Sequence, residues 1–333
     1  MNSKRVSVIK AVYRLICVLP LIFGSLSDAK QKIDFSALTS PTIFQGDHKY
    51  GFRDPAVVYH DDRFYLYFTL SETAADGGYY NMTALSMSSD LAHWTFPRII
   101  TPRDRNLNYS SPGNIIRYNH QWIICLQTYP TPNKETYGTQ DSRIWIMRSN
   151  DLKRWSEPEL LRVKGDDVPR DEMGRMIDPY LLEDAREKGK WWCFYKQNGV
   201  SMSYSFDLTS WTYVGRAKAG ENVTVIRQAD EYVMFHSPSN GIGVKRSQDP
   251  KSWGSDRQFL TLGQKDWPWS QGRLTAATVI DLTQEPSVGK YIMFFHGSSK
   301  AGLKAHRAHG AASLAVAWSD DLVNWSWPGN NER

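Results

Sequence analysis

The sequence predicts an all-β protein, a five-bladed β-propeller whose blades are four-stranded antiparallel sheets. The first observation is a short motif, Asp-Leu-x-x-Trp, that occurs five times, once with Pro in place of Leu. Its copies begin at Asp90, Asp151, Asp207, Asp249 and Asp321. The second observation is that each copy follows a small-residue strand pattern, itself preceded by two apolar runs joined by a polar turn. Because one such sheet buries too little surface alone, the five sheets are expected to pack face to face around an axis.

The first unit shows how the motif serves this fold. Residues 57–59 and 64–68 are β-branched and aromatic runs on either side of a polar turn, which predicts a hairpin. A third strand at residues 85–88 leads to Asp90, whose carboxylate can accept bonds from backbone amides of the following turn. Leu91 and the tryptophan then anchor the turn in the core. We therefore interpret the motif as structural rather than catalytic.

The other four units repeat the same hairpin pattern. Their apolar runs are residues 114–117 and 122–126, 180–182 and 191–195, 223–226 and 232–235, and 278–280 and 291–295. About 300 residues remain after the N-terminal segment described next, or roughly 60 per unit, which suits one propeller. We expect residues 30–333 to form a single catalytic domain.

Residues 1–29 differ from the rest of the chain. Four basic residues, Lys4, Arg5, Lys10 and Arg14, precede an apolar run at residues 15–23. Small residues Gly24 and Ser25 follow, and Ala29 offers a plausible cleavage point. The apolar run is about half the length that a membrane-spanning helix needs, so a secretory signal peptide is favoured over an anchor. The mature protein is therefore expected to be secreted or periplasmic, with no membrane span.

The basic character of the sequence belongs mainly to this leader. The full chain has 40 basic and 35 acidic residues, and removal of four basic residues and Asp28 leaves 36 and 34. A net charge near +2 gives no reason to expect a nucleic-acid partner. Cys125 and Cys193 lie in apolar runs, where we expect two buried thiols; a disulfide between blades is the alternative, and two cysteines make no metal site.

The start of each innermost strand is the place to look for chemistry, because these strands surround the axis and their first residues meet in one funnel. The residues at these positions are Arg53-Asp54-Pro55, Ser111 to Asn114, Ile177-Asp178-Pro179, Gly220-Glu221-Asn222 and Gly272 to Thr275. Three carboxylates and two arginines are thus expected to converge. Their mutual repulsion should raise the pKa of at least one carboxyl group, which contributes nothing to a purely structural site.

A protonated acid beside an ionised base is what glycoside cleavage requires. At these residues the chain resembles glycoside hydrolase family 43, whose members are five-bladed propellers. The likeness lies in residues 52–57, 176–181 and 220–223, the last followed by 232–237. It extends over essentially the whole mature chain, and the order of the motifs along the blades agrees.

The resemblance implies a role for each acidic residue. Asp54 would be the general base, Asp178 would orient the acid and tune its pKa, and Glu221 would be the general acid. Family members invert the anomeric centre, so the carboxyl groups of Asp54 and Glu221 should lie roughly 6.5–9.5 Å apart. The expected activity is hydrolysis of pentosyl or galactosyl linkages in plant or algal polysaccharides or oligosaccharides.

Further residues are candidates for contacts with the substrate or a metal ion. Arg273 resembles an arginine that family members direct at the sugar and the carboxylates. Arg53 and Asn114 stand at strand starts, where Arg53 either contacts the sugar or braces the strand. Trp269 belongs to a loop expected at the funnel mouth, where sugar rings stack on indole faces. His296 resembles an axial histidine near a bound calcium ion; no cofactor is expected to be required, but a structural calcium on the axis is an alternative.

Two other functions stay open from the sequence. One is a propeller that only binds carbohydrate. The other is a retaining relative of fructan-cleaving enzymes, which would carry Arg-Asp-Pro in blade 2 and Glu-Cys in blade 3. Here Arg-Asp-Pro lies in blade 1, and the sequence contains no Glu-Cys pair.

Overall fold

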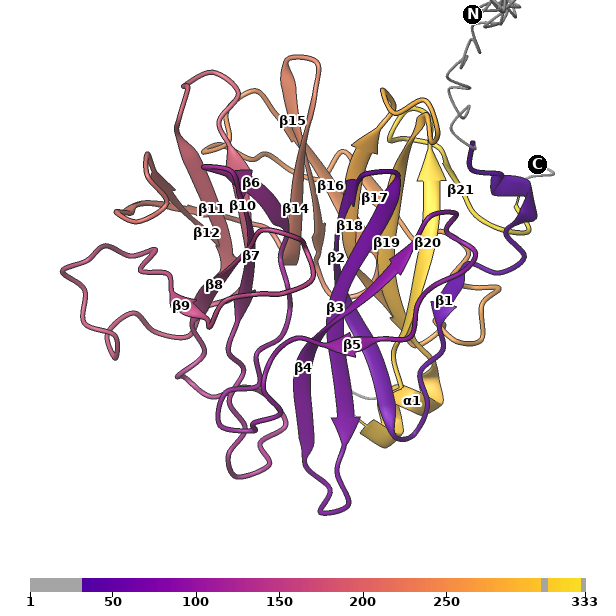
Figure 1. The fold of residues 1–333 in the computed structure, drawn as a ribbon, viewed down its shortest axis with the longest axis horizontal. Coiled ribbons are helices and arrows are strands. Elements are labelled where there is room, and N and C mark those ends of the chain that lie inside the picture. Colours follow the sequence, from indigo (N-terminus) through magenta and orange to yellow (C-terminus); the bar gives the residue numbers. More distant parts are fainter. Residues whose placement is uncertain (1–31, 307–310, 331–333) are drawn as a thin grey trace, which may run out of the picture. The chain divides into compact units, whose positions relative to one another are not determined.

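A computed structural model describes residues 32–306 and 311–330, and the predicted signal peptide lies outside these residues. The described chain forms five antiparallel sheets that follow one another along the sequence (Figure 1). The innermost strand of blade 1, β2, contacts the innermost strands of blades 2 and 5, so the sheets close into a ring. The prediction of a five-bladed β-propeller is confirmed. None of the described helices could cross a lipid bilayer.

Blades 1 to 4 each contain four strands in sequence order, with the innermost strand first. Blades 1 and 2 are β2 (Tyr50–His60), β3 (Arg63–Thr73), β4 (Tyr79–Ser88) and β5 (Arg98–Ile99), then β6 (Ile115–Tyr118), β7 (Gln121–Gln127), β8 (Ile144–Ser149) and β9 (Glu159–Leu160). Blades 3 and 4 are β10 (Ile177–Glu183), β11 (Trp191–Lys196), β12 (Val200–Ser205) and β13 (Thr212–Ala217), then β14 (Glu221–Gln228), β15 (Glu231–Ser237), β16 (Ile242–Ser247) and β17 (Gln258–Leu260). Blade 5 contains β18 (Arg273–Leu282), β19 (Lys290–Ser298) and β20 (Ser313–Ser319).

Blade 5 is completed by a strand from the other end of the chain. The short strand β1 (Thr42–Phe44) pairs with β20 as the outer strand, and β21 (Trp325–Ser326) also pairs with β20. Figure 1 shows β1 beside β20 although more than 260 residues separate them. This pairing ties the first and last parts of the propeller together. The sequence analysis did not predict it.

Two short helices complete the described structure: the 3-10 helix η1 (Phe35–Ala37) and the α-helix α1 (Lys300–His306), which follows β19. The core lies between the blades, where apolar faces of neighbouring sheets meet. Cys125 and Cys193 are both buried there as free thiols, which confirms the expectation for these residues. Burial raises the pKa of the Cys125 thiol to about 12, so it stays protonated.

The repeated motif forms a pinned turn, as predicted. In blade 2, Asp151 Oδ1 accepts hydrogen bonds from the backbone N–H groups of Lys153 (2.9 Å) and Arg154 (2.7 Å). Leu152 is buried and has a φ of 59°, a left-handed conformation that a leucine adopts only where packing holds it. Asp90, Asp207 and Asp321 accept the same pair of bonds. The structural interpretation of the motif is confirmed.

Removal of one such carboxylate should lower the stability of the protein without changing the candidate active site. Asp151→Ala leaves two turn amides without their acceptor, at a cost of about 1–2 kcal/mol. We expect the melting temperature to fall by a few degrees, measured by differential scanning calorimetry. Asp167→Ala, in an exposed loop, is the matched control and should leave it unchanged. Equal melting temperatures of the two variants would contradict the pinned turn.

Candidate active site

One backbone feature recurs at the inner end of every blade. A non-glycine residue with positive φ occurs near the start of each innermost strand: Asp54 (48°), Ser111 (42°), Asp178 (51°), Asn222 (51°) and Ala276 (55°). In four of the blades the strand pairing shifts register at this point, as in a β-bulge. Asp and Asn tolerate this conformation better than most residues. The bulge therefore explains why acidic and amide side chains stand at these equivalent positions.

Side chains from the preceding blade hold this ring in place. Backbone N–H groups of four of these residues donate to a side chain on the second strand of the blade before: Asp54 to His296 Nδ1 (3.1 Å), Ser111 to Thr69 Oγ1 (2.8 Å), Asp178 to Gln127 Oε1 (2.6 Å) and Ala276 to Ser237 Oγ (2.8 Å). Each bond satisfies a backbone donor that the bulge leaves unpaired. The bonds join neighbouring blades and fix the floor of the funnel.

Blade 4 departs from the predicted alignment. The sequence analysis placed Glu221 at the position of Asp54 and Asp178, but Asn222 has the matching conformation and Glu221 precedes it by one residue. Glu221 pairs with Ser237, before the shift in register. The register shift itself is the same as in blade 1, so Glu221 stands at the position of Arg53, and Asn222 stands at the position of Asp54. Glu221 still reaches the site, but from a different place in the blade.

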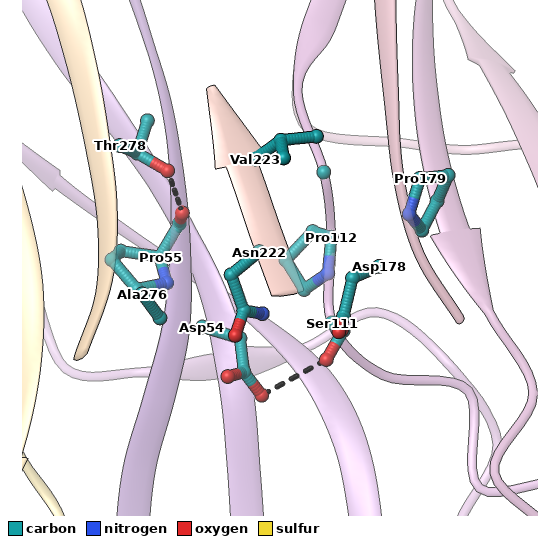
Figure 2. A pocket seen from close by; sticks show the side chains of 11 residues that line it. Asp54, Pro55, Ser111, Pro112, Asp178, Pro179, Asn222, Val223, Ala276 and Thr278 are labelled. Atoms are coloured by element: carbon teal, nitrogen blue, oxygen red, sulfur yellow. Dashed lines mark hydrogen bonds between the residues drawn. The ribbon is translucent and has the colours of Figure 1, made fainter. Parts of the chain in front are cut away.

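A cavity of about 140 Å³ gathers the predicted polar residues. Its walls include the three carboxyl side chains of Asp54, Asp178 and Glu221, together with Arg53, Arg273 and His296. Beneath it, a cavity of about 20 Å³ on the axis has room for one water molecule. Figure 2 shows the side chains of Asp54, Ser111, Asp178 and Asn222 converging at one end of that smaller cavity. The prediction that the three carboxyl groups meet in one funnel is thus met.

Asp54 is buried but kept ionised. Burial alone would raise the pKa of its carboxyl group, but the Arg53 guanidinium 3.4 Å away opposes this effect. Hydroxyl groups of Ser111 and Thr69 each donate to Asp54 Oδ2 at 3.0 Å. The net effect lowers the pKa of Asp54 below its ordinary value. A buried, desolvated carboxylate in this state can accept a proton from a bound water.

The pKa of the Asp178 carboxyl group is shifted in the opposite direction, above its ordinary value. Burial, followed by the negative charges of Glu221 and Asp54, raises the pKa of its carboxyl group to about 8. Asp178 therefore holds a proton at neutral pH. The sequence analysis predicted that crowding would raise at least one pKa, and Asp178 is the group that carries the effect.

Glu221 is more open than the two aspartates. Its side chain is 33% exposed, and its Oε1 forms an ion pair with the Arg273 guanidinium at 2.9 Å. Arg273 comes from the first residue of β18 in blade 5, so the pair bridges two blades. Arg273 therefore contacts one of the carboxylates of the cavity, and its partner is Glu221.

His296 was predicted as a candidate metal ligand. Burial lowers the pKa of its imidazole to about 3, so the ring is neutral. Its Nδ1 accepts the backbone N–H of Asp54, and the Asp54 carboxylate lies 3.7 Å away. Calcium takes six to eight oxygen ligands, but the described residues contain no cluster of three or more His, Cys, Asp or Glu side chains suited to a metal. A calcium ion on the axis stays a prediction; the contact that the structure gives His296 is the hydrogen bond that orients the backbone at Asp54.

Two predicted substrate contacts lie elsewhere. Asn114 does not line the cavity, because its side-chain amide bonds both backbone groups of Leu181 in blade 3, at 2.7 and 2.9 Å. Trp269 stacks on Trp267 with ring centroids 5.2 Å apart and packs near Phe295. Asn114 thus joins two blades, and Trp269 is partly buried against the core between blades 4 and 5.

Four lining residues were missed by the sequence analysis: Gln127, Tyr129, Tyr137 and Arg175. Gln127 ends a second strand, and the other three belong to loops of blades 2 and 3. The only signal for Arg175 was its place three residues before Asp178 in a stretch already singled out. Tyr137 is 60% exposed at the mouth, where the sequence analysis had placed a tryptophan.

The cavity opens into a wider groove. Tyr137 and Arg273 line both the cavity and a groove of about 690 Å³, whose other walls are loops of blades 4 and 5 and Leu303 of α1. An enclosed apolar cavity of about 150 Å³ takes a ring of the size of benzene. The arrangement therefore has room for one sugar ring inside and for a longer moiety outside.

Comparisons with known proteins bear on the fold. No model of a known protein family matches the sequence, and no curated protein matches it. Solved structures do match, over most of their length and at low identity.

Three of these structures illustrate the likeness. An exo-1,5-α-L-arabinanase from a bovine ruminal metagenomic library is 20% identical with a TM-score of 0.57, covering 83% of this chain and 95% of that chain. The catalytic domain of an α-L-arabinofuranosidase from Coprinopsis cinerea is 13% identical, with a TM-score of 0.59 and coverage of 84% and 95%. A family 43 β-xylosidase/α-arabinofuranosidase from a compost microbial metagenome, in complex with xylotriose, is 12% identical, with a TM-score of 0.59 and coverage of 86% and 98%. The chain shares its fold with these proteins.

Proposed function

We propose that this protein is a glycoside hydrolase that removes a terminal sugar by a single inverting displacement. The observation that carries the proposal is the opposite perturbation of two buried carboxyl groups in one cavity: Asp54 is kept ionised and Asp178 is kept protonated. Pairs of carboxyl groups whose pKa values are driven apart are typical of sites that need one base and one acid.

Asp54 serves as the base in this mechanism. Its Oδ2 accepts bonds from Ser111 and Thr69, which hold the carboxylate in place. Asp54 removes a proton from a water molecule as the water attacks the anomeric carbon from the face opposite the leaving group.

Asp178 and Glu221 supply the proton for the leaving group. Asp178 stores it, because its pKa is raised to about 8. Glu221 is the more exposed of the two and lies beside Arg273, the residue that borders the outer groove. We assign delivery of the proton to Glu221, at the end of the cavity where the leaving group exits.

The similar structures support the substrate class. They include an arabinanase, arabinofuranosidases and a xylosidase. By analogy of fold and site, the substrate is a pentosyl or galactosyl unit at the end of a plant or algal polysaccharide or oligosaccharide. The groove beyond Tyr137 and Arg273 holds the rest of the chain, which favours removal of terminal units. Secretion, proposed from residues 1–29, agrees with such a substrate.

A panel of aryl glycosides tests this function. Purified protein is incubated with 4-nitrophenyl α- and β-glycosides of arabinofuranose, xylose and galactose, and release of nitrophenol is measured. Hydrolysis of at least one substrate, abolished in Asp54→Asn, is expected. A protein that binds oligosaccharides but cleaves none of them would favour the binding-only propeller.

Tyr137 gives a test of how the substrate is placed. The exposed ring stands where the cavity meets the groove and offers a face for a sugar ring. Tyr137→Ala is expected to raise KM for oligosaccharides by about three- to tenfold, with kcat changed less. Tyr213→Ala, an exposed tyrosine on β13, is the matched control. An unchanged KM in Tyr137→Ala would place the substrate elsewhere.

A further inference from the structure

The charge of the cavity is not balanced by its own carboxylates. Three arginines line it: Arg53, Arg175 and Arg273. Arg53 forms an ion pair with Asp54 and Arg273 with Glu221. Burial and the neighbouring carboxylates raise the pKa of Asp178 and outweigh the charge of Arg175, which lowers it, so Asp178 stays protonated; Arg175 forms no ion pair within 4.0 Å with it. Among the described residues, Arg175 thus has no carboxylate in ion-pair contact, although it faces the space where the sugar would bind.

The structure around Arg175 positions its guanidinium group. Its Nε donates to the backbone carbonyl of Gly138 at 3.2 Å, and the guanidinium lies 5.4 Å from the centre of the Tyr129 ring. Gly138 packs so closely on that ring that an added Cβ would come within 2.7 Å of it. These contacts fix the inner nitrogen and leave the two terminal nitrogens without a hydrogen-bond partner among the described residues.

The backbone of Arg175 is fixed as well. Gln197 Nε2 donates to the carbonyl groups of Met173 (3.0 Å) and Arg175 (3.1 Å). Gly174, with a φ of 70°, makes the turn between them. A loop residue held at its backbone and at Nε loses little further freedom when a ligand binds, which favours affinity.

We propose that Arg175 makes the cavity selective for a sugar that carries an anionic group, either the carboxylate of a uronic acid or a sulfate ester. The two terminal nitrogens of a guanidinium match the two oxygens of such a group and bind it through a bidentate pair of hydrogen bonds. The volume of about 140 Å³ suits one sugar ring. This inference rests on the proposed function and narrows it, since the sugar that the site takes is then an anionic unit rather than a neutral pentosyl or galactosyl unit.

Matched pairs of sugars test the proposal. Isothermal titration calorimetry at low salt compares D-glucuronate with D-glucose, D-galacturonate with D-galactose, and D-galactose 6-sulfate with D-galactose. The proteins are the wild type, Arg175→Gln, Arg175→Lys and the control Arg117→Gln, an exposed arginine on β6. Melting curves verify that all four are folded.

The wild type is expected to bind at least one anionic sugar ten or more times more tightly than the matching neutral sugar. Tighter binding of the uronates indicates a carboxylate ligand, and tighter binding of galactose 6-sulfate indicates a sulfate ligand. Arg175→Gln should lose this preference while its affinity for the neutral sugar changes less than threefold. Arg175→Lys should keep part of it, because a point charge remains without the bidentate geometry. A wild type with no anionic preference, or a preference that survives in Arg175→Gln, overturns the proposal.

Hydrolysis of neutral aryl glycosides, measured in parallel, separates this proposal from the proposed function. Activity without any anionic preference rejects the role of Arg175 alone. Binding of an anionic sugar without hydrolysis of any glycoside, charged or neutral, rejects the catalytic function but supports Arg175 as a binding residue for anionic sugars.

Discussion

Replacing Glu221 with glutamine is expected to lower kcat by about 10²- to 10⁴-fold on substrates with a poor leaving group. Glutamine keeps the size of the side chain and can still contact Arg273, but it has no proton to deliver. The loss should be much smaller for a 2,4-dinitrophenyl glycoside, because that leaving group departs without protonation. Steady-state kinetics on the two substrates measure the difference.

Two controls sharpen this experiment. Glu183→Gln, at the exposed end of β10, should leave both rates unchanged. Asp54→Asn should lower both rates to the same extent, because activation of water does not depend on the leaving group. If Glu221→Gln lost activity equally on both substrates, Glu221 would not be the proton donor.

Replacing Asp178 with asparagine is expected to lower kcat by about 10²-fold and, at the same time, to stabilise the protein. The loss of activity follows because asparagine cannot store the proton. In the wild type, kcat/KM should fall above an apparent pKa of about 8, where Asp178 loses its proton. Asp178→Asn should not show this alkaline decline at that pH.

The gain in stability depends on pH in a definite direction. The pKa of Asp178 is raised in the folded state, from 3.8 to about 8. Its contribution to stability is therefore fully present below pH 3.8 and is lost as the pH rises toward 8, by at most about 1.4 kcal/mol per pH unit. Asp178→Asn removes this loss. Its melting temperature should equal that of the wild type near pH 4 and exceed it increasingly up to pH 8.

Thermal melts at pH 4, 6 and 8 check this prediction. Asp171→Asn, in the loop before blade 3, is an exposed control that should follow the wild type at every pH. A stability difference that stayed the same from pH 4 to pH 8 would mean that Asp178 is ionised in the folded protein.

The blades were predictable because the signal is local and repeated. In each blade the two apolar runs indicate a hairpin, and the motif that contains Asp151 in blade 2 indicates a turn. Both signals come from neighbouring residues alone. The closing strand β1 was not predictable in this way, since three residues carry no periodicity and their partner is β20. Long-range pairing of a short strand leaves no trace in its own sequence.

The site was predictable in part for a related reason. Asp54 and Asp178 are each followed by proline at a strand start, and this repeat identified them. Glu221 lies one residue before the position equivalent to Asp54 and Asp178, and the apolar pattern of the strand does not reveal this offset. Arg175 reaches the cavity from a loop whose path depends on a bond to Gly138 in another blade. Such contacts are set by tertiary structure rather than by residue order.

The stereochemistry of the first product tests the central claim most directly. ¹H NMR of the anomeric region follows hydrolysis of an active aryl glycoside within the first turnovers, before the released sugar equilibrates between its anomers. A single displacement with Asp54 as base predicts that the sugar appears first with the anomeric configuration opposite to that of the substrate. A first product with the configuration of the substrate would show a covalent intermediate and would contradict this account.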